Sequence, residues 1–155
     1  MPSPAEGIAW YLNSKGIGST ATSTSTGIWP IKVGKLFDTP HAQIALYDTG
    51  GFNPNTKWLL DFVTVQALVR GDKNDYAGAY QKSLDIKDSL LGVNPQEIGP
   101  TGNRVWWSGV TMLADIAFLG YDKNERPQFS TNFRILLERT KSTLSNRDPL
   151  NYTGV

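Results

Sequence analysis

The stretch Gln128–Glu138 constrains the fold of this chain more than any other, because apolar and polar residues alternate along it. Alternation with a period of two is typical of a β-strand that is buried on one face. The residues expected to face the core are Phe129, Thr131, Phe133, Ile135 and Leu137. Burial of each large apolar side chain contributes about 1.5–3 kcal/mol, so the register of this strand is strongly specified.

The segments before this strand predict its neighbours. Trp107–Leu119 is a strand-forming stretch, and we expect it to make a long antiparallel hairpin with Gln128–Glu138. A third strand ends at Arg70, with Val63, Val65, Ala67 and Val69 on its core side. The helix that follows starts at Asn74 or Asp75, either of which can cap it, and Gly92 ends it.

The N-terminal part carries weaker signals. Residues 5–15 predict a short helix that stops at Gly16. Two strands are expected around Ile31–Phe37 and Ala42–Tyr47, with a turn between them and a turn-rich loop over residues 48–56. These elements predict an α+β fold: a mainly antiparallel β-sheet with one long helix packed on it, a short N-terminal helix and a long C-terminal β-hairpin.

Two segments have no expected place in the core. Residues 19–27 are rich in Ser and Thr, and they form either a linker or a β-prone arm that orders against a neighbouring subunit. Residues 139–155 are polar and are expected to form a surface tail. Residues 1–155, these two segments included, are expected to form a single domain.

Composition restricts the classes of function. Fifteen Lys and Arg residues against 14 Asp and Glu give a formal charge of +1, which is not typical of a dedicated nucleic-acid-binding protein. The absence of Cys excludes disulfides and thiolate sites. No apolar run approaches the roughly 20 residues that span a bilayer, and the N-terminus does not resemble a signal peptide, so we expect a soluble intracellular protein.

The chain offers little for catalysis. His41 is the only histidine and lies in an expected turn, so neither a metal site nor a histidine base is indicated. Asp61 and Asp115 lie in expected strands. They could form an acid–base pair if they shared a cleft. The simpler interpretation is that they are residues of the polar strand face or partners for Arg70, Arg104 or Arg134. We therefore expect no enzyme activity and no cofactor.

The pair Trp106–Trp107 places two large rings on opposite faces of one strand, so one ring joins the core and the other faces solvent or a partner. Other residues outside the expected core are also candidates for contacts with partner molecules. The complete set of candidate interface residues is Thr22, Thr24, Trp29, Phe52, Asn53, Trp106, Trp107, Tyr121, Lys123, Arg126 and Arg147.

Two blocks of residues resemble the tail terminator or minor capsid proteins of long-tailed bacteriophages. The first comprises Arg70-Gly71, Asn74-Asp75-Tyr76, Ala79-Tyr80, Ile86-Lys87-Asp88 and Leu90-Leu91-Gly92. The second comprises Asp115-Ile116, Leu119-Gly120-Tyr121-Asp122, Arg126-Pro127, Phe129-Ser130 and Asn132-Phe133-Arg134. Together they cover roughly residues 62–140.

The resemblance implies a structural virion protein that forms a ring, typically of six subunits, on the head-proximal end of the tail tube. Such a ring stops tube growth and joins the tail to a head-completion protein, while DNA passes through its lumen. Assembly would take place in the host cytoplasm. Two alternatives remain open: a head-completion or neck connector protein, and a stand-alone carbohydrate-binding module that uses exposed tryptophans.

Overall fold

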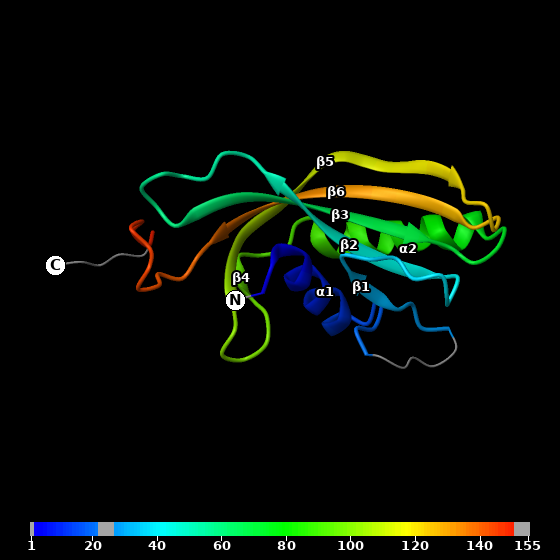
Figure 1. The fold of residues 1–155 in the computed structure, drawn as a ribbon, viewed down its shortest axis with the longest axis horizontal. Helices are drawn as coiled ribbons and strands as arrows, with labels where there is room; N and C mark the ends of the chain where they lie inside the picture. Colours follow the sequence, from blue (N-terminus) through cyan, green and yellow to red (C-terminus); the bar gives the residue numbers. More distant parts are fainter. Residues whose placement is uncertain (1, 22–26, 151–155) are drawn as a thin grey trace.

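The computed structural model describes residues 2–21 and 27–150, and in these residues six strands form one sheet with two helices on one side of it (Figure 1). The strand order is β1-β2-β3-β6-β5-β4. The core lies between the helices and the sheet, where residues of both helices join one cluster with the inward side chains of the strands. The predicted α+β fold is confirmed.

The N-terminal helix α1 spans Pro4–Ser14, as the sequence predicted to within a residue. Ser3 caps it: its hydroxyl accepts a hydrogen bond from the Glu6 N–H, and the Glu6 carboxylate accepts one from the Ser3 N–H. This reciprocal pair satisfies two N–H groups that a helix start leaves free. Ile8, Tyr11 and Leu12 are buried against the sheet.

The centre of the sheet is the antiparallel pair β3 (Leu60–Arg70) and β6 (Pro127–Glu138). The alternation of β6 is confirmed, because Phe129, Thr131, Phe133, Ile135 and Leu137 are each at most 2% exposed. Val65, Ala67 and Val69 of β3 are fully buried on the same face, opposite Phe133, Thr131 and Phe129. Register is fixed here because a slip by one residue would expose this whole apolar set.

The β1 edge of the sheet differs from the prediction. β1 covers only Ile31–Val33, and it pairs in parallel with β2 (Gln43–Gly51) rather than forming a hairpin with it. Residues 34–42 are therefore a connection across the end of the strands, where Gly34 has a positive φ of 78°. β2 also extends through residues 48–51, which the sequence predicted to be loop.

Helix α2 spans Tyr76–Leu90, and the predicted caps are confirmed. The Asp75 carboxylate accepts a hydrogen bond from the Gly78 N–H, and Gly92 has the left-handed φ of 76° that ends many helices. Ala79, Ser83, Ile86 and Leu90 face the sheet and are buried.

The hairpin is longer than predicted, and one strand was missed. β5 spans Val105–Tyr121 and pairs with β6, while the short strand β4 (Gln96–Ile98) pairs with the first three residues of β5. Three residues with no alternation carry too little signal to predict β4.

The segment after β6 returns to the body of the protein. Leu59 N–H donates to the Asp148 carbonyl and Asp148 N–H donates to the Lys57 carbonyl, so the segment up to residue 148 is held beside the start of β3. Main-chain and ionic contacts therefore bind this part of the predicted surface tail back to the sheet, while its residues stay exposed or half-buried.

Candidate subunit interface

The second half of β5 is an open sheet edge. β4 covers only Val105–Trp107, and Gly109–Tyr121 has a strand partner on one side alone, β6, among the residues that the structure describes. Four register shifts interrupt this pairing. Unpaired N–H and C=O groups along such an edge can pair with another chain.

This open edge is apolar on its surface. The exposed fractions of Leu113, Phe118, Leu119 and Tyr121 lie between 44% and 54%. Asp115 is the only charged residue from Gly109 to Tyr121. Edge strands of soluble monomers are usually protected by charges or by a covering element, and contiguous exposed apolar surface marks sites of interaction.

Helix α2 continues the apolar surface beside β5. The rings of Tyr76 and Phe118 lie edge to face at 5.0 Å, and the Tyr80 ring lies 5.8 Å from that of Phe129. Phe118 also contacts Tyr121 at 5.7 Å. Tyr76 and Tyr80 remain 46% and 43% exposed. We call Gly109–Tyr121 together with Tyr76 and Tyr80 the open face.

One ion pair ties this part of β5 to α2. Lys87 Nζ lies 3.0 Å from Asp115 Oδ1, which explains the position of Lys87 on the apolar side of the helix. The hydrogen bond with Asp115 raises the pKa of Lys87. The pKa of Asp115 is lowered, first by the hydrogen bond that it accepts from the Ile116 N–H and then by the one from Lys87.

Asp61 lies in a different environment at the start of β3. Its carboxylate accepts hydrogen bonds from Arg139 Nε and, at 2.7 Å, from Arg147 Nη1. Burial raises the pKa of Asp61, but the hydrogen bonds and charges of Arg147 and Arg139 outweigh it and place the pKa below its usual value. Asp61 and Asp115 therefore have different partners, Arg139 and Arg147 for one and Lys87 for the other. The predicted partners Arg70, Arg104 and Arg134 are wrong.

Two buried arginines organise the opposite end of the strands. Arg70 is 3% exposed and donates to the carbonyl oxygens of Phe37, Pro40 and His41 at 2.6–2.9 Å. Arg126 is 4% exposed and donates to Asp122 Oδ2 at 2.8 Å and to the Asp38 carbonyl at 2.7 Å. These contacts fix the connection 37–41 against the hairpin turn.

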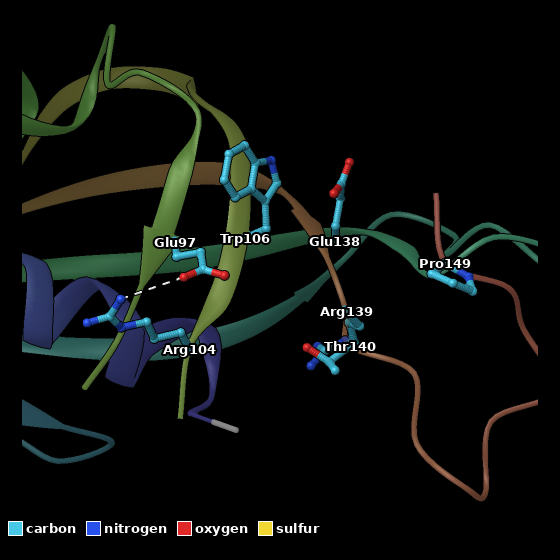
Figure 2. Close-up of a pocket in the computed structure, with 7 residues that line it drawn as sticks. All are labelled: Glu97, Arg104, Trp106, Glu138, Arg139, Thr140 and Pro149. Carbon is cyan, nitrogen blue, oxygen red and sulfur yellow. Dashed lines mark ion pairs between the residues drawn. The ribbon is translucent and has the colours of Figure 1, made fainter. Parts of the chain in front are cut away.

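A hollow on the surface lies between the sheet and the returning C-terminal segment (Figure 2). Its volume is about 180 Å³, and it is lined by Glu97, Arg104, Trp106, Glu138, Arg139, Thr140 and Pro149. An ion pair of 3.6 Å joins Arg104 to Glu97 on its wall. In the described residues no group of three His, Asp or Glu side chains could hold a metal ion.

The structure separates the predicted interface residues into surface and interior. Phe52, Asn53, Trp106, Tyr121 and Lys123 are exposed, whereas Trp29 and Arg147 are half-buried. Trp107 and Arg126 are buried within the subunit, Trp107 against α1 and Arg126 in its ion pairs, so their side chains do not reach the surface. Thr22 and Thr24 lie outside the described residues.

Sequence reasoning missed the apolar residues of the open face, notably Leu113, Phe118 and Leu119. The signal was present, since Met112–Tyr121 contains no polar residue other than Asp115 and Tyr121 and does not alternate, whereas the paired strand β6 does. A strand that is apolar on both faces needs cover on both.

Comparisons with known proteins bear on the family and the fold of this chain. The protein family described as "Bacteriophage tail terminator protein" matches residues 11–139. No curated protein sequence matches the chain.

Solved structures share the fold. One of them is a chain of the "Virion of native gene transfer agent (GTA) particle", with a TM-score of 0.54 and 14% sequence identity. The match covers 70% of this chain and 78% of that chain. In the described residues no helix is long and apolar enough to cross a membrane.

Proposed function

This chain belongs to the bacteriophage tail terminator family, and we propose that it forms a ring on the head-proximal end of the tail tube. The ring ends tube growth and joins the tail to the head. The ring, of six subunits as the resemblance implies, assembles in the host cytoplasm. Its partners are other copies of the chain, the tail tube protein and a head-completion protein.

The open edge of β5 is the observation that carries this proposal. A ring needs lateral contacts between subunits, and an apolar strand edge that lacks a partner in the subunit is suited to one. β3, β6 and the second half of β5 run along the length of the molecule, so a contact through the edges of the sheet leaves the two ends of these strands free for axial contacts (Figure 1).

The two ends of the strands differ, which a terminator requires. One end carries the hairpin turn and the connection 37–41, held by Arg70 and Arg126. The other carries residues 52–58 and the returning C-terminal segment, held by Asp61. A ring with two unlike faces can bind the tube with one face and the head-completion protein with the other. No further tube ring can then add to it.

DNA passes through the lumen of this ring without sequence-specific binding. The near balance of 15 basic and 14 acidic residues supports passage, because a strongly basic subunit would hold the phosphate backbone.

Interrupting the gene in its phage tests the function. We expect overlong tails without heads, because nothing then stops the tube. Tails of normal length that lack heads would instead support the head-completion alternative, and normal tails on full heads would contradict both.

A further inference from the structure

We propose that the open face of one subunit binds the β1 edge of a second copy, which we define as Ile28–Phe37. This inference rests on the proposed ring and names the two surfaces that form it. Its basis is the position, the exposed apolar side chains and the charge of the two surfaces.

The β1 edge lies at the far side of the sheet from the open face, because β1 is the first strand in the order and β5 lies beyond the central pair. Ile28, Val33 and Phe37 are 46%, 41% and 41% exposed there. Each subunit thus has exposed apolar side chains at two opposite edges of one sheet. Ser19 pairs with the main chain of Trp29 and Ile31, but the side chains of Ile28, Val33 and Phe37 remain exposed.

The β1 edge is positively charged, whereas the open face carries one carboxylate, which is paired with Lys87 of α2. Lys32 and Lys35 are the only charged residues of the β1 edge, and their Nζ atoms lie 5.0 and 5.4 Å from the centre of the Phe37 ring. The open strand carries Asp115, whose side chain remains 72% exposed beside Lys87. A contact between unlike surfaces places the lysines near a carboxylate.

Contacts between like surfaces are less favourable. Pairing of two β1 edges brings four lysine side chains together. Antiparallel pairing of two open strands about their middle brings the two Asp115 carboxylates face to face, since Asp115 lies midway between Gly109 and Tyr121. Contact between unlike edges is heterologous, so it repeats from subunit to subunit until the ring closes.

Cysteine cross-linking tests this contact cleanly, because the natural chain has no cysteine. Val33→Cys is combined in turn with Leu113→Cys and with Leu119→Cys, all at exposed positions. Both double variants are oxidised as purified protein and in tails from phage that carry them, and are then separated without reductant. We expect a ladder of covalent multimers that ends at the closed ring for at least one pair.

Single and control variants separate the possible outcomes. Mixing Val33→Cys chains with the other single-cysteine chain of whichever pair gives the ladder should give dimers only. Neither Leu113→Cys alone nor Leu119→Cys alone should give any. Leu144→Cys with Leu113→Cys is the matched control, because Leu144 is 91% exposed but lies on neither surface, and it should give no ladder.

Two results would overturn the inference. One is dimerisation of Leu113→Cys alone, which would show that two open faces meet. The other is the absence of any ladder, from protein and tails alike, with both double variants. Rings seen in electron micrographs of the same tails would then leave the proposed function standing, whereas tails without a terminal ring would contradict it as well.

Discussion

The two halves of β5 contain similar residues but have different surroundings. In the first half, β4 pairs with Val105–Trp107, and α1 packs against Trp107, whose ring lies 5.9 Å from that of Tyr11. Trp107 is fully buried there. In the second half, no described strand pairs with the outer edge, and Leu119 is 54% exposed.

This difference shows that apolar content does not decide burial in this chain. The cover over each face of the strand decides it: Trp107 packs against α1 and is buried, whereas Trp106, which also pairs with β4, is 38% exposed. The first half accordingly stabilises the subunit, and the second half is available for assembly. Substitutions in the two halves should therefore separate folding from association.

Trp107→Ala should have the largest effect on folding. It removes a fully buried ring and leaves a cavity, so we expect the free energy of unfolding to fall by about 3–5 kcal/mol. Urea denaturation followed by circular dichroism measures this change. The neighbouring Trp106→Ala is the control, because Trp106 is 38% exposed and its loss should cost far less. Equal losses would contradict the assignment of Trp107 to the core.

Asp61→Asn should lower the free energy of unfolding by less than Trp107→Ala does. Asp61 lies at the same end of the sheet as Trp107. Leu137 pairs with Trp107 on one side and with Asp61 on the other. Removing the charge leaves Arg139 and Arg147 without this carboxylate, which should cost about 1–3 kcal/mol at neutral pH.

The same variant should alter the dependence of stability on pH. Because the pKa of Asp61 is lowered in the folded protein, its stabilising contribution is present above the unfolded-state pKa and is lost as the pH falls through the folded-state value. The natural protein should therefore lose stability below about pH 4, and Asp61→Asn should lose less. Parallel pH profiles would contradict a stabilising role for this carboxylate.

Leu119→Lys should have a small effect on folding and a large one on assembly. The side chain is exposed in the subunit, so the free energy of unfolding should change by no more than about 0.5 kcal/mol. A charge on the apolar open face should nevertheless weaken association, which sedimentation velocity detects. Unchanged association would contradict the role of the second half of β5.

Asp115→Asn should have the smallest effect on the subunit. The carboxylate is exposed, and surface ion pairs such as that with Lys87 contribute little to stability. We expect no measurable change in the melting temperature, and a measurable decrease would show that this ion pair holds α2 on the sheet.

Local patterns predicted the central part of the fold well. The alternation in β6, the Asp75 cap of α2 and the split between Trp106 and Trp107 depend on neighbouring residues, and all three are confirmed. The parallel pairing of β1 with β2 could not be predicted in this way, because it depends on how residues 34–42 cross the end of the sheet.

The candidate interface was harder to predict than the fold. Which side of β5 remains open depends on the short strand β4, which carries almost no sequence signal. The docking of the C-terminal segment depends on Asp61, 78 residues before Arg139 in the chain. Such pairings over long separations cannot be read from local periodicity.

The native mass of the purified protein, measured over a wide range of concentration and with electron microscopy of any large species, tests the central claim most directly. The account predicts that the natural chain forms closed rings, and that Leu119→Lys remains folded but monomeric. Dimers of two-fold symmetry that do not enlarge with concentration, in the natural chain and in Leu119→Lys alike, would contradict it.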